Sequence, residues 1–270
     1  MTGIATSMLH LFAFRRQGKC LQRDACGSRS GEQVLSEAST MDRLVASKAA
    51  TDHFTRTRWW WIRHAPVRVD EGRIYGQRDL PCDCSEGAVF AALAALLPQD
   101  AVWVTSHLSR TVQTAKAIQA VGNFASPEIH QDRDFAEQHL GDWQGLDRQS
   151  FLLGRQQEPE SFWYAAADER APNGESFVDV VERVSTGVAR VNRAHPGKDI
   201  IAVAHGGTIR AALVIALRVP PRSGFAFTID NCALTRLDHY EGKRGAGWRV
   251  TTVNQRPLPA SGDNAGGALA

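Results

Sequence analysis

The chain has 270 residues, of which 43% are hydrophobic and 22% are charged, as is ordinary for a soluble globular protein. Its formal net charge of +2 at pH 7 is too small to indicate a nucleic-acid or membrane-surface partner. The five cysteines have the spacing of neither a secreted disulfide framework nor a zinc site. We therefore expect a cytoplasmic protein without a metal or another cofactor, whose basic groups act at one site.

The two ends of the chain differ in composition from the middle. Residues 1–56 are rich in Gly, Ser, Gln and scattered charge without periodicity, which predicts a poorly ordered N-terminal extension. Its apolar start precedes basic residues, the reverse of the order in a secretory signal peptide. Residues 255–270 predict a flexible C-terminal tail. One domain is expected between them, over residues 57–254.

The first part of this domain alternates strand signals with helix signals. The run "WWWI" from Trp59 to Ile62 is typical of a strand that is covered on both faces. A helix is expected over "GAVFAALAALLP", with Asp83 and Glu86 as a capping box before it. A second strand is expected at 101–106, followed by a helix over "SRTVQTAKAIQAVG" with its first serine as N-cap.

The second part continues the alternation. A short strand is expected near 128–132, and the valine stripe of "SFVDVVERVSTGVARVNRAH" predicts an amphipathic helix. The buried strand "DIIAVAH" leads into the helix "TIRAALVIAL", and "FAFTI", "ALTRLDHY" and "WRVTTV" are expected as closing strands. This pattern predicts an α/β fold, a three-layer α/β/α sandwich around a mostly parallel central sheet.

Chemically active side chains follow the buried strands. In open parallel sheets, ligands bind outside the carboxyl ends of the strands. The first strand ends at Arg63-His64, the second leads to Arg110, and the third ends at His205-Gly206. Guanidinium groups and the backbone N–H groups at the helix start after Gly206 suit a phosphoryl group. A neutral imidazole can attack phosphorus directly, so His64 is the expected nucleophile and a small phosphorylated metabolite is the expected ligand.

Such a reaction also needs a proton donor for the departing alkoxide. Glu137, in the loop-like segment "RDFAEQHLGDWQG", is the first candidate. Asp134, Asp142 and Glu175 are neighbouring carboxylates, and the pattern does not exclude them. Of the remaining histidines, which we expect to be structural, His107 lies nearest to the expected site because it ends a strand.

Five segments in order resemble the histidine phosphatase superfamily, the phosphoglycerate mutase-like proteins. They are Arg63-His64, "SHLSRTVQTAKAI", "FAEQHLGDWQG", "PNGESFVDVVERV" and "IAVAHGGTIRAAL". The resemblance implies a phosphoglycerate mutase-like fold, with His64 as the phosphorylated nucleophile and Glu137 as acid and base. It further implies that Arg63, Arg110 and His205 bind the phosphate and that no metal takes part.

Within that family, "GRIYGQRDLPCD" and the short segment after Gly145 look most like the small phosphatases related to α-ribazole phosphatase of cobalamin synthesis. A small cap is expected within about 146–175, where Phe162, Trp163 and Tyr164 either contact an aromatic or sugar moiety or pack the cap. The expected function is a metal-independent phosphatase of a small metabolite that acts through a phosphohistidine, with α-ribazole 5′-phosphate as a candidate substrate.

Other functions stay open at this point. They are a phosphoglycerate mutase, a protein phosphohistidine phosphatase and a non-catalytic sensor of a phosphate ligand. The sensor is motivated by two departures from the family pattern, Ala65 where glycine is usual and Asp70 where many members have asparagine. The oligomeric state, monomer or homodimer, is equally open.

Overall fold

The computed structural model describes residues 54–155 and 163–257. Most of the expected N-terminal extension, the end of the expected tail from residue 258 on, and Phe162 of the expected cap lie outside the described residues. The first strand begins at Thr55, just before the expected start of the domain.

A six-stranded sheet forms the centre of the described part, in the order β3-β2-β4-β1-β5-β6. The strands are β1 (Thr55–Arg63), β2 (Val102–Thr105), β3 (Ile129–Gln131), β4 (Asp199–Ala204), β5 (Leu234–Gly242) and β6 (Gly245–Gln255). β3, β2, β4 and β1 pair in parallel, while β5 and β6 form an antiparallel hairpin beside β1. The expected mostly parallel sheet is confirmed.

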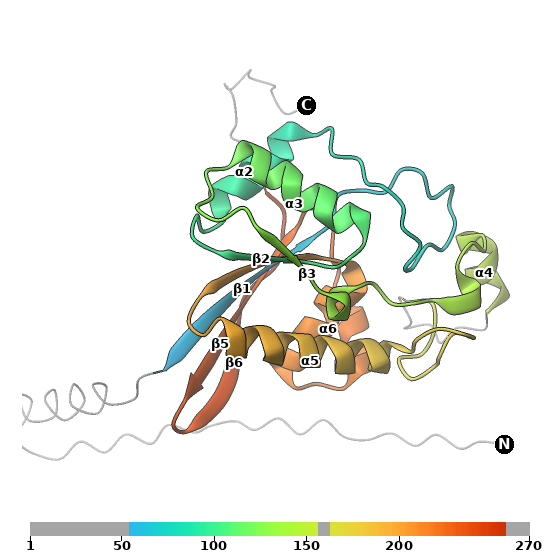
Figure 1. The fold of residues 1–270 in the computed structure, drawn as a ribbon. Helices are drawn as coiled ribbons and strands as arrows, with labels where there is room; N and C mark the ends of the chain where they lie inside the picture. The colour runs from blue at the N-terminus through green and yellow to red at the C-terminus, as the bar shows by residue number, and fades with distance from the viewer. Residues whose placement is uncertain (1–53, 156–162, 258–270) are drawn as a thin grey trace, which may run out of the picture. The chain divides into compact units, whose positions relative to one another are not determined.

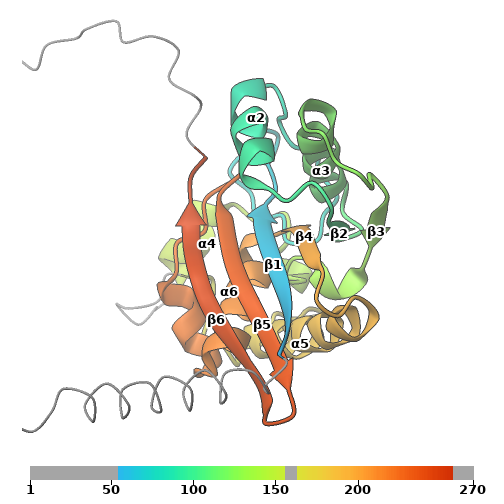
Figure 2. The same ribbon diagram turned by 90° about the vertical axis from the view of Figure 1, so that its left-hand side faces the viewer.

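Helices cover both faces of this sheet (Figures 1 and 2). They are α2 (Gly87–Leu96), α3 (Ser109–Val121), α4 (Arg148–Gly154), α5 (Phe177–Ala194) and α6 (Gly206–Leu217), with short 3-10 turns η1 (Arg133–Phe135), η2 (Gly141–Trp143) and η3 (Pro221–Ala226). α2 and α3 pack on one face and α5 and α6 on the other, which confirms the three layers. None of the described helices is long and apolar enough to cross a membrane.

The opening run of tryptophans shows how β1 is held between these layers. Successive side chains of a strand point to opposite faces of the sheet. Trp59 and Trp61 are therefore buried together under α5 and α6, with stacked rings 4.9 Å apart, whereas Ile62 is buried under α2 and α3. Burial on both faces makes β1 a rigid support for the residues that follow it.

Local details differ from the expected caps of α2 and α3. The side chain of Asp83 accepts a hydrogen bond from the Ser85 N–H (3.0 Å) and does not cap α2, which begins without a side-chain cap. Ser109 is the first residue of α3 and not its N-cap, and its N–H is bound by the Asp79 carboxylate at 2.7 Å. At the start of α3, the distant Asp79 thus binds a backbone N–H group, whereas a local N-cap residue was expected to do so.

The expected strand "FAFTI" is wrong. This segment belongs to η3 and to the extended chain after it. Phe225 is buried, with its ring 4.8 Å from that of Phe177 and 5.7 Å from that of Trp163. The segment's buried side chains Phe225 and Ile229 pack in the core with residues of α5 and α6. Burial without sheet pairing therefore accounts for the apolar pattern of the segment.

Candidate active site

The register of two parallel strands brings the two key histidines together. Arg63 at the end of β1 pairs with Ala204 at the end of β4, and the His64 N–H donates to the Ala204 carbonyl at 2.9 Å. The next residues along each strand, His64 and His205, therefore lie side by side. Their ring centroids are 5.2 Å apart, and both side chains are buried.

The backbone fixes which nitrogen of His64 carries the proton. Its Nδ1 lies 2.7 Å from the carbonyl oxygen of Ala65, which can only accept a hydrogen bond. In the neutral ring Nδ1 is therefore the donor, and the lone pair is on Nε2. The Asn231 side chain donates to the His64 carbonyl at 2.7 Å and holds the same turn from the other side. This is the tautomer that a nucleophilic imidazole needs.

A chain of hydroxyl groups fixes His205 in the opposite tautomer. The nearest acceptor for the Thr111 hydroxyl proton is the Leu108 carbonyl at 2.8 Å, so Thr111 accepts from Ser106 at 3.0 Å. Ser106 Oγ in turn accepts from His205 Nε2 at 2.8 Å. The other nitrogen, Nδ1, then accepts from Arg110 Nε at 3.3 Å.

Two arginines bring positive charge to the pair of imidazoles. Arg110 is fully buried and donates to the carbonyl groups of Arg78 (2.9 Å) and Gly76 (2.7 Å). Arg63 donates from Nη1 to the Ile229 carbonyl at 2.6 Å, and its Nε is buried without a hydrogen-bond partner among the described residues. These carbonyl partners orient the guanidinium groups without neutralising them, which suits an anionic ligand.

Burial and these charges keep both imidazoles neutral. Burial is the largest cause that lowers the pKa of His64 well below its usual value, followed by Arg110 and Arg63. The pKa of His205 is lowered in the same direction by burial, Arg110 and His64. The lone pair of His64 Nε2 is therefore available at neutral pH.

Glu137, in the segment between η1 and η2, contacts the first turn of α6. One of its carboxylate oxygens accepts from the N–H groups of Gly207 (3.1 Å) and Gln138 (3.0 Å). A small cavity of about 130 Å³ is lined by Glu137 together with Arg63 and Gly206. A carboxyl group, a guanidinium group and the first residue of a helix thus face the same space.

The neighbouring carboxylates have other partners. Glu175 forms an ion pair with Arg183 at 2.8 Å, and Asp134 forms one with Arg190 at 2.8 Å. Asp142 accepts from the Asn173 side chain at 2.9 Å. None of the three lines the small cavity, so the geometry favours Glu137 among the four candidates.

Several residues that support this site were not anticipated from the sequence. Arg183 donates to the carbonyls of Asp134 (2.8 Å), Ala136 (2.8 Å) and Glu137 (3.0 Å), and so holds the segment that carries the carboxylate. Gln77 donates to the Glu137 carbonyl at 2.7 Å. Neither residue carries a local signal, because each acts on a segment far away in the sequence.

The rest of the small cavity has a cationic and aromatic lining. Arg210, one turn into α6, lies over the ring of Trp163 at 4.7 Å, and burial lowers its pKa to about 10. Trp163, Tyr164 and Tyr75 also line the cavity. Of the aromatic residues expected in the cap, the two described ones therefore border the site, and Trp163 packs against Phe225 as well.

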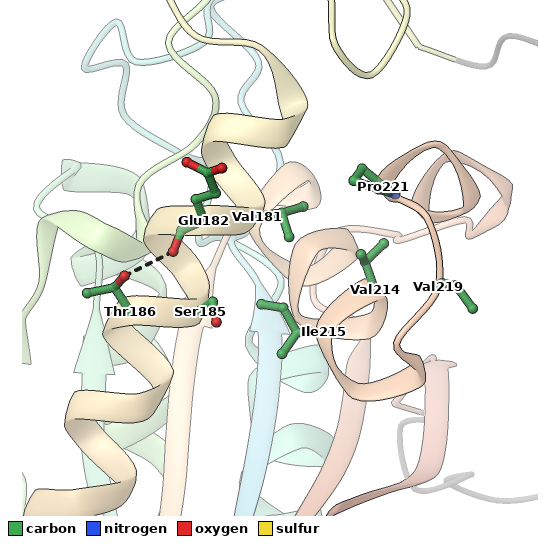
Figure 3. Close-up of a pocket in the computed structure, with 8 residues that line it drawn as sticks. All are labelled: Val181, Glu182, Ser185, Thr186, Val214, Ile215, Val219 and Pro221. Atoms are coloured by element: carbon green, nitrogen blue, oxygen red, sulfur yellow. Dashed lines mark hydrogen bonds between the residues drawn. The ribbon is translucent and has the colours of Figure 1, made fainter.

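A larger cavity, of about 590 Å³, lies between α5 and α6 (Figure 3). Its wall is mainly apolar, with Val181, Val214, Ile215, Val219 and Pro221 as its hydrophobic members. Among the described residues, its lining includes no basic side chain and none of the residues at the ends of β1, β2 and β4. Of these two cavities, the smaller one alone is lined by candidate residues, which are Arg63, Glu137 and Gly206.

The two departures from the family pattern have simple structural explanations. Ala65 is buried, its φ is not positive, and its N–H donates to Thr114 Oγ1 at 2.8 Å, so the methyl group fits without backbone strain. Asp70 forms an ion pair with Arg148 of α4 at 2.6 Å, which balances its charge. Within the described ranges, no group of three or more His, Cys, Asp or Glu residues is arranged to hold a metal ion.

Comparison with known proteins supports the same chemistry. The model of the histidine phosphatase superfamily (branch 1) matches residues 59–255. The solved mycobacterial glucosyl-3-phosphoglycerate phosphatase Rv2419c is 26% identical, with a TM-score of 0.61 over 73% of this chain and 98% of that chain. The α-ribazole phosphatase of Shigella flexneri, 23% identical with a TM-score of 0.58 over 76% of this chain and 100% of that chain, shares the fold.

A curated relative is more similar over a shorter stretch. The phosphoglycerate mutase-like protein 4 of Arabidopsis thaliana is 36% identical over 108 residues, which are 40% of this chain and 46% of the relative. The match to three further curated relatives covers 59% of their length. The chain thus spans about half the length of these curated relatives.

The low pKa values of the two imidazoles make stability depend on pH. Below about pH 6.5 the unfolded chain binds protons at His64 and His205 that the folded protein does not bind. The free energy of unfolding should therefore fall as the pH is lowered from about 6.5 to about 5, by roughly 1.4 kcal/mol per pH unit for each imidazole. Urea denaturation at a series of pH values measures this slope.

The variant His64→Gln should lose about half of the slope that the two imidazoles cause together. The same substitution at the exposed His130 is the matched control for the loss of an imidazole outside the site. An unaltered slope in His64→Gln would contradict the assignment of a neutral, buried imidazole.

Proposed function

Because this chain belongs to the histidine phosphatase superfamily, we propose that it hydrolyses the phosphate monoester of a small metabolite through a phosphohistidine intermediate, without a metal. The observation that carries the proposal is the pair of buried, neutral imidazoles, whose ring centroids are 5.2 Å apart and whose pKa values Arg63 and Arg110 help to lower. This arrangement combines a nucleophile with the positive charge that a phosphoryl group requires.

In the first step, Arg63, Arg110 and the Gly206 N–H at the start of α6 bind the phosphate oxygens, while the Gly207 N–H stays bonded to Glu137. The lone pair of His64 Nε2 attacks phosphorus, so that a P–N bond forms while the ester P–O bond breaks. The leaving alkoxide takes a proton from the Glu137 carboxyl group. Two hydrogen bonds from backbone N–H groups hold this carboxyl group at the cavity and so support its position beside the leaving group.

In the second step, water attacks the phosphohistidine from the side that the alcohol has left. Glu137, now a carboxylate, takes a proton from this water, the P–N bond breaks, and His64 regains its lone pair. The bound dianion draws the Arg110 Nε–H away from His205 Nδ1, which then takes a proton from solvent and donates it in a hydrogen bond to the phosphate. The arginines supply the charge stabilisation that a metal ion would provide in other phosphatases.

The shape of the cavity supports a small substrate. Its volume of about 130 Å³ leaves room for a phosphoryl group and little more before the cap residues are reached. Trp163 and Tyr75 offer aromatic surface, and Arg210 offers a second cation beyond Arg63. α-Ribazole 5′-phosphate fits the aromatic surface, whereas a phosphoglycerate derivative fits the second cation. Both are candidate substrates.

Hydrolysis of a generic aryl phosphate in the presence of EDTA tests the reaction type. The wild-type protein should keep its full rate, because no step uses a metal ion. The variant His64→Ala should lose at least about 10³-fold in kcat/KM, because it lacks the nucleophile. The matched control His130→Ala should retain the rate. Loss of activity in EDTA would indicate a metallohydrolase, and a rate that survives His64→Ala would exclude the phosphohistidine route.

The variant Glu137→Gln tests the proton donor. An alkyl phosphate needs protonation of its leaving group, whereas a nitrophenolate departs without it. The rate for the alkyl ester should therefore fall by about 10²-fold or more, and that for the aryl ester much less. Equal losses for both esters would place the acid elsewhere. Glu175→Gln is not a neutral control because it breaks the ion pair with Arg183, so Asp142→Asn is used instead.

A panel of metabolite phosphates tests the substrate class and the alternatives. The panel contains α-ribazole 5′-phosphate, 3-phosphoglycerate with and without a glucosyl group, and a phosphohistidine-containing protein. We expect one small monoester to exceed the aryl phosphate by at least about tenfold in kcat/KM. Transfer of phosphate between hydroxyl groups of phosphoglycerate would favour the mutase. Preference for the phosphohistidine-containing protein would favour the protein phosphohistidine phosphatase. Binding without turnover of any substrate would favour the sensor.

A further inference from the structure

Two cysteines outside the reaction lie in contact beside the site. The Sγ atoms of Cys82 and Cys84 are 3.5 Å apart, and both residues are partly exposed free thiols. A disulfide needs an S–S separation of about 2.05 Å, so a shift of roughly 1.5 Å would join them. The third described cysteine, Cys232, is buried.

The position of Cys82 links this pair of cysteines to Arg110 and, through Thr114, to the residue that follows His64. Its Sγ lies 3.3 Å from the carbonyl oxygen of Arg110 and 3.5 Å from Thr114 Oγ1. The same Thr114 hydroxyl accepts the N–H of Ala65, next to His64, at 2.8 Å. One thiol thus touches the turn that carries the phosphate-binding arginine and the residue that supports the nucleophile.

The backbone around the two cysteines is bonded to the same elements. The Cys82 N–H donates to the Gln113 side chain of α3 at 3.0 Å, and the Asp83 N–H donates to the Pro66 carbonyl at 2.7 Å. A change in the 82–84 turn therefore cannot stay local, because α3 and the loop after His64 are both attached to it.

We propose that Cys82 and Cys84 form a reversible redox switch, in which a hydroperoxide oxidises them to a disulfide and so weakens phosphate binding. The Cys82 thiolate attacks one peroxide oxygen and becomes a sulfenic acid, and the other oxygen leaves as water once protonated. Cys84 then attacks the Cys82 sulfur, the S–S bond forms, and the hydroxyl group leaves with the Cys84 proton as water. The two thiols supply the two electrons that peroxide takes up, and an added dithiol reverses the change.

The surroundings assign the order of attack. Burial and the neighbouring Cys82 raise the pKa of the Cys84 thiol to about 12, and burial raises that of Cys232 to about 12. Neither forms much thiolate at neutral pH, which makes each a poor first nucleophile toward peroxide. Cys82 is therefore assigned the first attack, and Cys84, whose Sγ lies 3.5 Å away, gives its proton to the departing hydroxyl group as it resolves the sulfenic acid.

Closure of the disulfide requires a movement of the Sγ atoms, and Cys82 Sγ is in contact with the Arg110 carbonyl at 3.3 Å. Displacement of about 1 Å in a site that positions a substrate can lower its rate by roughly 10²-fold. Because Arg110 is assigned to phosphate binding, the effect should fall mainly on KM. This kinetic part rests on the proposed phosphatase function, whereas the formation of the disulfide does not.

The test uses the full chain with Cys20→Ser and Cys26→Ser, which leaves only the three described cysteines. The protein is treated with hydrogen peroxide, and its free thiols, intact mass and kinetics with an aryl phosphate are measured before and after a dithiol reductant. We expect two thiols to be lost with a mass decrease of two hydrogens, and peptide mapping to place the bond between Cys82 and Cys84. KM should rise at least about tenfold and return on reduction.

Two variants are matched controls. Cys84→Ser should keep its basal rate and stop at a Cys82 sulfenic acid, with a mass increase of one oxygen, whereas Cys232→Ser should still form the disulfide. Retention of all three thiols, a bond that involves Cys232, or a disulfide that leaves KM unchanged would each overturn the proposal. If no variant hydrolyses any phosphate, the thiol and mass data still decide whether the pair closes, so failure of the proposed function is distinguishable.

Discussion

The parallel pairing of β1 with β4 is the constraint on which the site depends. The register sets Arg63 opposite Ala204, so the residues that follow, His64 and His205, emerge side by side. The strand residues before them are buried on both faces, and a slip of one residue would turn every tryptophan of β1 to the wrong layer. Core packing thus sets the distance between two imidazoles that belong to segments about 140 residues apart.

Electrostatics adds to this geometry. The buried guanidinium of Arg110 is oriented by carbonyl groups, and Arg63 retains a buried Nε without a protein partner among the described residues. Uncompensated positive charge in a buried site is costly until an anion binds, so the site is suited to a dianionic phosphoryl group. Burial and the same charge keep the imidazoles unprotonated, which preserves the proposed nucleophile in the free protein.

The sequence predicted the parts of this arrangement that follow from local patterns. Continuous apolar runs indicated β1, β2 and β4, and the rule for carboxyl ends placed Arg63, His64 and His205 together. The sequence named Glu137 as the first candidate for the proton donor but did not exclude Asp134, Asp142 and Glu175. Their exclusion depends on ion pairs and backbone contacts that form only in the fold. The supports from Ser106, Arg183 and Asn231 were missed for the same reason. The segment "FAFTI" was mistaken for a strand because a buried segment without sheet pairing has the same apolar pattern as a buried strand.

A crystal structure with orthovanadate is the most direct test of the account. Vanadate mimics the phosphoryl group in transfer. The account predicts vanadium bound to His64 Nε2, with its oxygens contacted by Arg63, Arg110 and His205 and with the Glu137 carboxyl group on the side opposite to His64. Vanadate bound away from His64, or held without Arg110 and His205, would contradict the claim that the two strand ends form one phosphoryl-transfer site.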